Sequence, residues 1–154
     1  MKMDRRLSGV LHVLMHMTQR GEPVTSEDLA MAMSTNPVVV RRVMAGLRAR
    51  GYVRSDRGHG GGWSIACDLD RVTLLDIYQA LGAPPPLAIG HRSDNPSCLV
   101  EQAVNAALDD SLRAAQALLL ERLGQVTLAD LAADFRARMA RRGPGFDQEK
   151  IHAL

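Results

Sequence analysis

Three arginines lie in contexts in which a guanidinium group could bind a polyanion. Arg41 and Arg42 follow Asn36-Pro37, a pair typical of a helix start, and Arg57 stands beside a glycine-rich run. A guanidinium donates paired hydrogen bonds to a phosphate or to the edge of a guanine, and polar groups at a helix start donate to phosphates. The candidate nucleic-acid contacts are Thr35, Asn36, Val38, Val39, Arg41, Arg42, Arg57, Gly58, His59 and Gly60.

Charge is distributed unevenly along the chain. The formal net charge is +2, but residues 1–63 hold ten Lys and Arg against five Asp and Glu, so that this part carries +5 and the remainder −3. This asymmetry suggests a polyanion-binding part joined to a part with another task. An unevenly charged, solvated surface is the alternative. Arg48 and Arg50, nearer the end of the predicted helix, are interpreted as general electrostatics or solvated charges.

The two cysteines are too few for a disulfide framework, which indicates a reducing cytoplasm. Cys98 lies near the predicted start of a long helix, where the helix dipole lowers the pKa of a thiol and favours its oxidation. It is therefore the candidate redox sensor, and a small buried apolar residue is the alternative. For Cys67 the buried interpretation is preferred. Regulation by a small molecule that binds a pocket is an equally open alternative to a redox sensor.

Motifs of other chemistries are missing from the sequence. There is no nucleophile elbow and no HExxH, and the glycine run lacks the Lys-Ser/Thr of a phosphate-binding loop. A thiol enzyme that uses Cys98 and His91 stays an alternative, although no third orienting group is identifiable. His12 and His16 share one face of a predicted helix, but no third metal ligand is evident. We therefore expect neither an enzyme nor a metal site.

Local signals predict a mainly helical framework. One short pattern begins at Thr25, Thr73 and Thr127, each followed three residues later by Asp, and it predicts three capped helix starts. Further helices are predicted over 4–20, from Asn36 to Gly51, and from about Cys98 to Leu123 with Asn95-Pro96 as the cap. The first of these helices is expected to turn Leu7, Leu11, Leu14 and Met15 inward.

Between the third predicted helix and Thr73 the sequence pattern changes from helical to β-compatible, which predicts a β-hairpin. Residues 52–55 and 63–66 are short β-compatible runs on either side of the glycines. The predicted order is a helix, a second helix, a short turn, a third helix and a hairpin, which is the order of a winged helix-turn-helix. In that architecture the second helix of the turn enters the major groove of DNA, and the hairpin contacts the DNA backbone or the minor groove.

Composition agrees with this architecture. Apolar residues make up 46% and aromatic residues 3%, which favours packed helices over a β-sandwich, and no apolar run approaches the roughly 20 residues that span a bilayer. We expect a mainly α fold with a hairpin wing. Its parts are a winged helix-turn-helix over 1–81, a loop or sensor segment over 82–97, dimerisation helices over 98–142 and a flexible tail over 143–154. A self-contained helical hairpin of the long helix with 127–142 is the alternative to dimerisation.

Five runs of the sequence resemble the Rrf family (Rrf-two) of bacterial transcription regulators, winged-helix relatives of the iron–sulfur cluster regulator and the nitric-oxide-sensing repressor. These runs are Thr25–Ala30, Asn36–Arg42, Leu47–Val53, Ser55–Trp63 and Val72–Tyr78. The resemblance covers about residues 3–135, and the hairpin motif is its most diagnostic part. Family members typically have Pro and Tyr where this chain has His59 and Trp63, changes that a wing tolerates.

The resemblance implies a homodimer on a palindromic operator in double-stranded DNA, with the long helix crossing to the partner, and we expect a cytoplasmic repressor. Iron–sulfur members carry three cysteines in the loop and at the start of the long helix, where this chain has only Cys98. Because a cluster usually needs four ligands, mostly thiolates, we expect no cofactor. A protein-interaction module that kept the helix-turn-helix shape but lost DNA binding is the main alternative.

Overall fold

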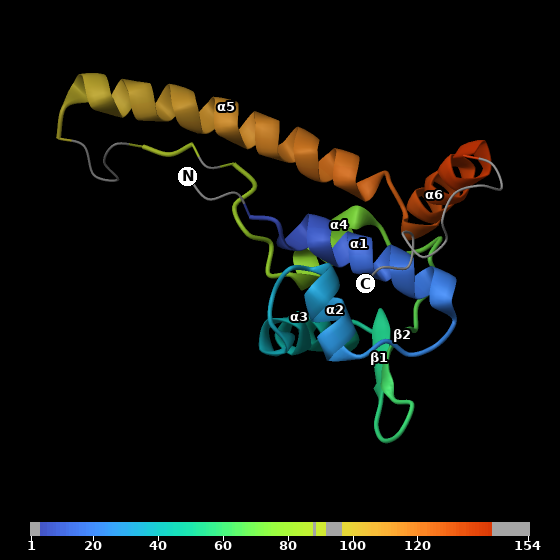
Figure 1. Ribbon diagram of the computed structural model, residues 1–154. Coiled ribbons are helices and arrows are strands. Elements are labelled where there is room, and N and C mark those ends of the chain that lie inside the picture. The colour runs from blue at the N-terminus through green and yellow to red at the C-terminus, as the bar shows by residue number, and fades with distance from the viewer. Residues whose placement is uncertain (1–3, 88, 92–96, 143–154) are drawn as a thin grey trace.

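A winged helix-turn-helix and a long projecting helix make up the computed structural model, which describes residues 4–87, 89–91 and 97–142 (Figure 1). The elements in chain order are α1 (Arg6–Arg20), α2 (Ser26–Ala32), α3 (Pro37–Ala49), β1 (Val53–Asp56), β2 (Gly62–Ile65), α4 (Leu74–Ala80), α5 (Leu99–Gly124) and α6 (Leu128–Arg142). The expected mainly α fold with a hairpin wing is confirmed. The predicted tail, 143–154, and the predicted cap, Asn95-Pro96, lie outside the described residues.

The predicted helix caps are present. The Thr25 side chain accepts a hydrogen bond from the Asp28 N–H, and Thr73 and Asp76 form a complete capping box. Asn36 Oδ1 accepts from the Val39 N–H at 3.0 Å, and Pro37 follows at the first helical position, where a missing N–H costs nothing. The start of α3 is therefore fixed by residues within its own first turn.

The hairpin has one more pairing partner than the sequence indicated. β1 and β2 pair antiparallel with Val53 opposite Ile65 and Asp56 opposite Gly62. Val24, between α1 and α2, adds a single bridge to β2: its N–H donates to the Trp63 carbonyl at 2.9 Å and its carbonyl accepts from the Trp63 N–H at 2.8 Å. This bridge attaches the wing to the segment that leads into α2.

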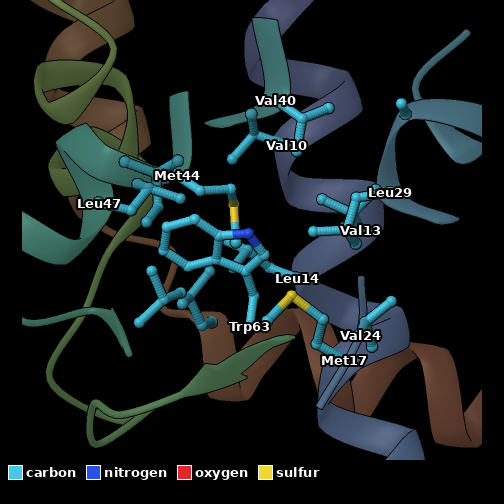
Figure 2. Packing of buried hydrophobic residues seen from close by; sticks show 14 of the residues in the cluster. Val10, Val13, Leu14, Met17, Val24, Leu29, Val40, Met44, Leu47 and Trp63 are labelled. Atoms are coloured by element: carbon cyan, nitrogen blue, oxygen red, sulfur yellow. The ribbon is translucent and has the colours of Figure 1, made fainter. Parts of the chain in front are cut away.

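The core lies where α1, α2 and α3 meet the base of the hairpin (Figure 2). Its members from α1 are Val10, Val13, Leu14 and Met17. The expectation for α1 was therefore right for Leu14 and holds in part for Leu7, Leu11 and Met15, which pack against the core without being fully buried. Those three are only partly buried, and they line an apolar groove of about 380 Å³ together with Leu74 and Leu131. α1 packs against α2, β2, α4 and α6, and these contacts select which of its apolar residues are fully buried.

Among the described residues, α5 packs against the winged helix-turn-helix through α4 near its C-terminal end. Gly124 lies against Leu75, and Thr73 bridges to Thr127 just beyond the helix. The N-terminal part of α5 extends past the domain, and no residue of this 26-residue helix is buried (Figure 1). α6 packs on α1 rather than along α5, so the helical-hairpin alternative is wrong. None of the described helices has the length and unbroken apolar character needed to cross a membrane.

Candidate nucleic-acid interface

The N-terminal half of α3 has exposed side chains on one face and buried apolar side chains on the opposite face. Val40 is fully buried, as are Met44 and Leu47 one and two turns further on. Because a helix buries residues three or four apart, the positions between them must face outward. The exposed side chains of this half and of the two residues before it are Thr35, Asn36, Val38, Val39, Arg41 and Arg42. All six are residues that the sequence singled out.

Arg41 and Arg42 differ in their surroundings. Arg41 Nη2 donates to Glu27 Oε1 of α2 at 2.8 Å, an ion pair in which both side chains are more than half exposed. Arg42 has no ion-pair partner among the described residues. A guanidinium that is not already paired binds an incoming anion without first giving up another partner. Arg42 is therefore the more available of the two groups.

The hairpin tip presents a second cationic group. Arg57, Gly58, His59 and Gly60 are all exposed between the two strands. Gly58 and Gly60 have φ of 94° and 75°, in the left-handed region that favours glycine. Two strands of four residues carry this tip away from the core, so backbone and Arg57 together are accessible to another molecule.

α3 and the hairpin lie on the same side of the molecule. In Figure 1 both are on the side of α1 that faces away from α5. α3 contacts β1 directly, because the chain reverses at Gly51, with φ of 78°, between the two elements. The basic helix and the glycine-rich tip can therefore face one ligand at the same time.

Two residues at the base of the wing differ from their sequence interpretation. Trp63 is a core residue, only 8% exposed, and not merely a tolerated wing substitution. Arg48, interpreted as general electrostatics or a solvated charge, is exposed, but it also donates from Nη1 to Ser55 Oγ of β1 at 3.0 Å and lies 5.8 Å from the Trp63 ring centroid. The signal that could have indicated this contact is Gly51, since a reversal there brings β1 back beside the end of α3.

The thiols lie in different environments. Cys98 is exposed at the N-cap of α5, where hydrogen bonds from the backbone N–H groups of Glu101 and Val100 lower the pKa of its thiol. Cys67 is half-buried, and burial raises the pKa of its thiol. His91 Nε2 lies 2.9 Å from Asp109 Oδ1, eleven residues after Cys98, which is about 16 Å along the helix. Cys98 and His91 therefore do not form the pair that a thiol enzyme would need.

No three His, Cys, Asp or Glu side chains within 4–87, 89–91 and 97–142 are grouped so that they could hold a metal ion. His12 and His16 stack with ring centroids 4.6 Å apart on α1. A stacked histidine pair without a third donor is typical of packing rather than of a metal site.

Comparison with known proteins agrees with this geometry. Residues 3–134 match the Rrf2 family, described as an iron-dependent transcriptional regulator. The Bacillus subtilis protein YwnA, named as an HTH-type transcriptional regulator, is 30% identical over 128 residues, 83% of this chain and 95% of that protein. A crystal structure described as a transcriptional regulator from Lactobacillus plantarum is similar with a TM-score of 0.69 and 25% identity, over 87% of this chain and 91% of that one. CymR, the global cysteine regulator of B. subtilis, has the same fold, with a TM-score of 0.59 and 22% identity over 86% and 97% of the two chains.

The iron dependence in the family description is not matched by the described residues. An iron site needs several thiolate, imidazole or carboxylate donors around one point. Cys98 lies at the start of α5 and His91 is paired with Asp109, eleven residues further along that helix, and the described part of the chain contains no group of three such donors. The donors within 4–87, 89–91 and 97–142 therefore do not fit an iron ion or cluster.

Proposed function

Because the chain belongs to the Rrf2 family of transcriptional regulators, we propose that it is a homodimeric repressor that binds a palindromic site in double-stranded DNA. The family and the relatives are regulators and not enzymes, which confirms the prediction that this protein is no enzyme. The observation that carries the proposal is the exposure of α3 and of the wing tip on one side of the domain.

In the proposed complex α3 enters the major groove with its N-terminal half. Arg42 donates to a base edge or a phosphate, and Val38 and Val39 offer apolar contact to thymine methyl groups. Thr35 and Asn36 lie at the helix N-terminus, where polar groups and the helix dipole favour a phosphate. Arg41 contributes once its guanidinium is shared between Glu27 and the DNA.

The wing makes the second proposed contact. The backbone of Gly58 and Gly60 can come close to the duplex, and Arg57 enters a narrow minor groove, whose negative potential attracts a guanidinium. His59 lies at the same exposed tip.

Arg57→Ala is expected to weaken binding to a DNA fragment carrying the operator by about tenfold and to reduce the salt dependence of the affinity by about one counterion. The measurement is a titration of labelled promoter DNA at several salt concentrations. Arg71→Ala is the control, because Arg71 is an exposed arginine outside α3 and the wing. An unchanged affinity and salt slope for Arg57→Ala would remove the wing from the interface. If the unaltered protein shows no salt-dependent binding to promoter DNA, the chain is an interaction module instead.

α5 supplies the proposed dimer contact. Val100, Val104 and Leu108 repeat every four residues, and Leu118 and Leu119 continue the same stripe, all of them exposed in the single chain. Exposure of such an apolar stripe to water along a helix of this length is energetically unfavourable. The α5 helix of a second subunit would cover the stripe. Dimer symmetry then places two half-sites about 34 Å apart, or a multiple of that distance.

Val104→Glu is expected to convert the dimer to a monomer at micromolar concentration, because it buries a charge in the proposed α5 contact. Analytical ultracentrifugation measures the outcome. The matched control is Ala106→Glu, which adds the same charge to the same helix about 200° around its axis from Val104. A monomeric unaltered protein, or a Val104→Glu variant that remains dimeric, would contradict α5 as the dimer contact.

We propose that the regulator responds to an oxidant through Cys98. Its thiol is exposed and has a lowered pKa, so a larger fraction is thiolate near neutral pH than for Cys67. Iodoacetamide at pH 7.5 is therefore expected to modify Cys98 several times faster than Cys67, as measured by peptide mass spectrometry. Diamide should join the Cys98 thiols of the two subunits in a disulfide, taking up their two protons and two electrons, and so weaken DNA binding of the unaltered protein, whereas Cys98→Ser should be unaffected. An oxidant-insensitive protein would instead favour a small-molecule effector, for which the apolar groove along α1 offers space.

A further inference from the structure

The direction of the wing relative to α3 must be set by contacts at the base of the hairpin. β1 and β2 have four residues each, and a two-stranded hairpin of this size is only marginally stable by itself. Beyond its base the tip is exposed. The position of Arg57 with respect to α3 therefore depends on how the base is held.

Trp63 holds the β2 side of this base. Its backbone is bridged to Val24, and its indole Nε1 donates to Ser26 Oγ at the start of α2 with an N–O distance of 3.0 Å. The ring itself lies within the core, close to Met44 of α3 and Leu14 of α1 (Figure 2). β2 is thus attached to α2 and to the core.

Arg48 holds the β1 side. Its Nη1 donates to Ser55 Oγ, the residue directly opposite Trp63 in the hairpin register, at 3.0 Å. Its guanidinium also lies over the Trp63 ring, 5.8 Å from the centroid, where a cation is attracted to the face of an indole. One side chain of α3 therefore contacts both strands of the wing at the same level.

We propose that Arg48 is a positioning residue that holds the wing in one direction relative to α3 through Ser55 and Trp63. The wing tip and the N-terminal half of α3 then reach the same duplex without a separate ordering step. Contacts that are ordered before binding contribute more to affinity than contacts that must be ordered on binding. This inference rests on the proposed function, because it concerns how the two DNA-binding elements act together.

Ser55→Ala tests this role without changing any charge. Loss of the Arg48–Ser55 hydrogen bond should weaken operator binding about threefold and lower the salt slope, because Arg57 is then held less firmly in the minor groove. The same variant should reduce the effect of Arg57→Ala from about tenfold to about threefold, a coupling between residues that do not touch. Binding is titrated at several salt concentrations for the unaltered protein, both single variants and the double variant.

A second double-mutant cycle distinguishes a positioning role of Arg48 from a contribution of its charge alone. Arg48→Gln and Arg50→Gln remove the same charge two residues apart near the end of α3. Arg48→Gln should couple to Arg57→Ala as Ser55→Ala does, whereas Arg50→Gln should be additive with it. Arg48→Lys keeps the charge and a donor and should restore most of the coupling. Thermal unfolding of each variant confirms that the fold is retained.

The outcomes distinguish this inference from the proposed function. One outcome is that the unaltered protein binds its promoter and that Ser55→Ala has the same affinity, the same salt slope and the same response to Arg57→Ala as the unaltered protein. The positioning role of Arg48 is then wrong, while DNA binding stands. Equal losses for Arg48→Gln and Arg50→Gln, both additive with Arg57→Ala, would make Arg48 a simple contributor of charge. Only a failure of the unaltered protein to bind DNA would reject the function itself.

Discussion

Replacing Arg42 and Arg57 together by Ala is expected to weaken operator binding by about a hundredfold or more. Each arginine is exposed, one on α3 and one at the wing tip, and each is proposed to contact a different groove of the duplex. A guanidinium contact with a base edge or a phosphate contributes about 1–3 kcal/mol, and contacts at separate places add approximately. The loss should exceed that of any single arginine in the chain.

The effect of this double variant is measured by titration of labelled operator DNA at one fixed salt concentration. The matched control is Arg71→Ala with Arg113→Ala, which removes two exposed arginines outside α3 and the wing. The control should cost no more than a few-fold, because long-range attraction is screened beyond about 10 Å at 0.1 M salt. Equal losses for the two double variants would mean that binding depends on overall charge and not on this surface.

Gly62→Ala is expected to lower the free energy of unfolding by about 2–4 kcal/mol. A Cβ at this position would lie 2.6 Å from the carbonyl oxygen of Val24 and 2.8 Å from its carbonyl carbon, and φ is 153°. Both neighbours are backbone atoms, so no side-chain rotation can relieve the overlap. The bridge between Val24 and Trp63 would have to open, and the Trp63 ring would lose its place in the core.

Chemical denaturation followed by far-UV circular dichroism measures this loss. Gly90→Ala is the control, since a Cβ there meets no atom within 4 Å and the backbone is not in the left-handed region. It should change the free energy of unfolding by less than about 0.5 kcal/mol. A Gly62→Ala variant as stable as the unaltered protein would show that β2 does not approach Val24 so closely.

The helix starts were predictable from the sequence because the groups that fix them are close in the chain. Thr25, Thr73 and Thr127 each cap a helix with an Asp three residues on, and Asn36 caps α3. The hairpin was predictable for the same reason: the glycines that allow its turn lie between its two strands. The proposed DNA contacts on α3 and the tip could thus be chosen from local patterns.

The contacts that hold these elements together were not predictable in the same way. The Val24–Trp63 bridge joins residues 39 positions apart, and the Trp63–Ser26 hydrogen bond is 37 apart. Even the Arg48–Ser55 bond, seven residues apart, requires the chain to reverse and bring two elements into register. The inward face of α1 was only partly assigned because its apolar residues cover more than one face, and packing against α2, β2, α4 and α6 selects the fully buried ones.

The amino-acid sequence alone determined which helices and hairpin form, since capping, periodicity and turn residues act within a few positions of each other. It also determined the uneven charge, which makes residues 1–63 the basic part of the chain. The packing of the elements, in contrast, places α3 and the wing on one side, keeps Cys98 and His91 apart, and leaves the apolar stripe of α5 uncovered. These properties depend on distances between elements, and such distances are set by how side chains from distant parts of the chain pack.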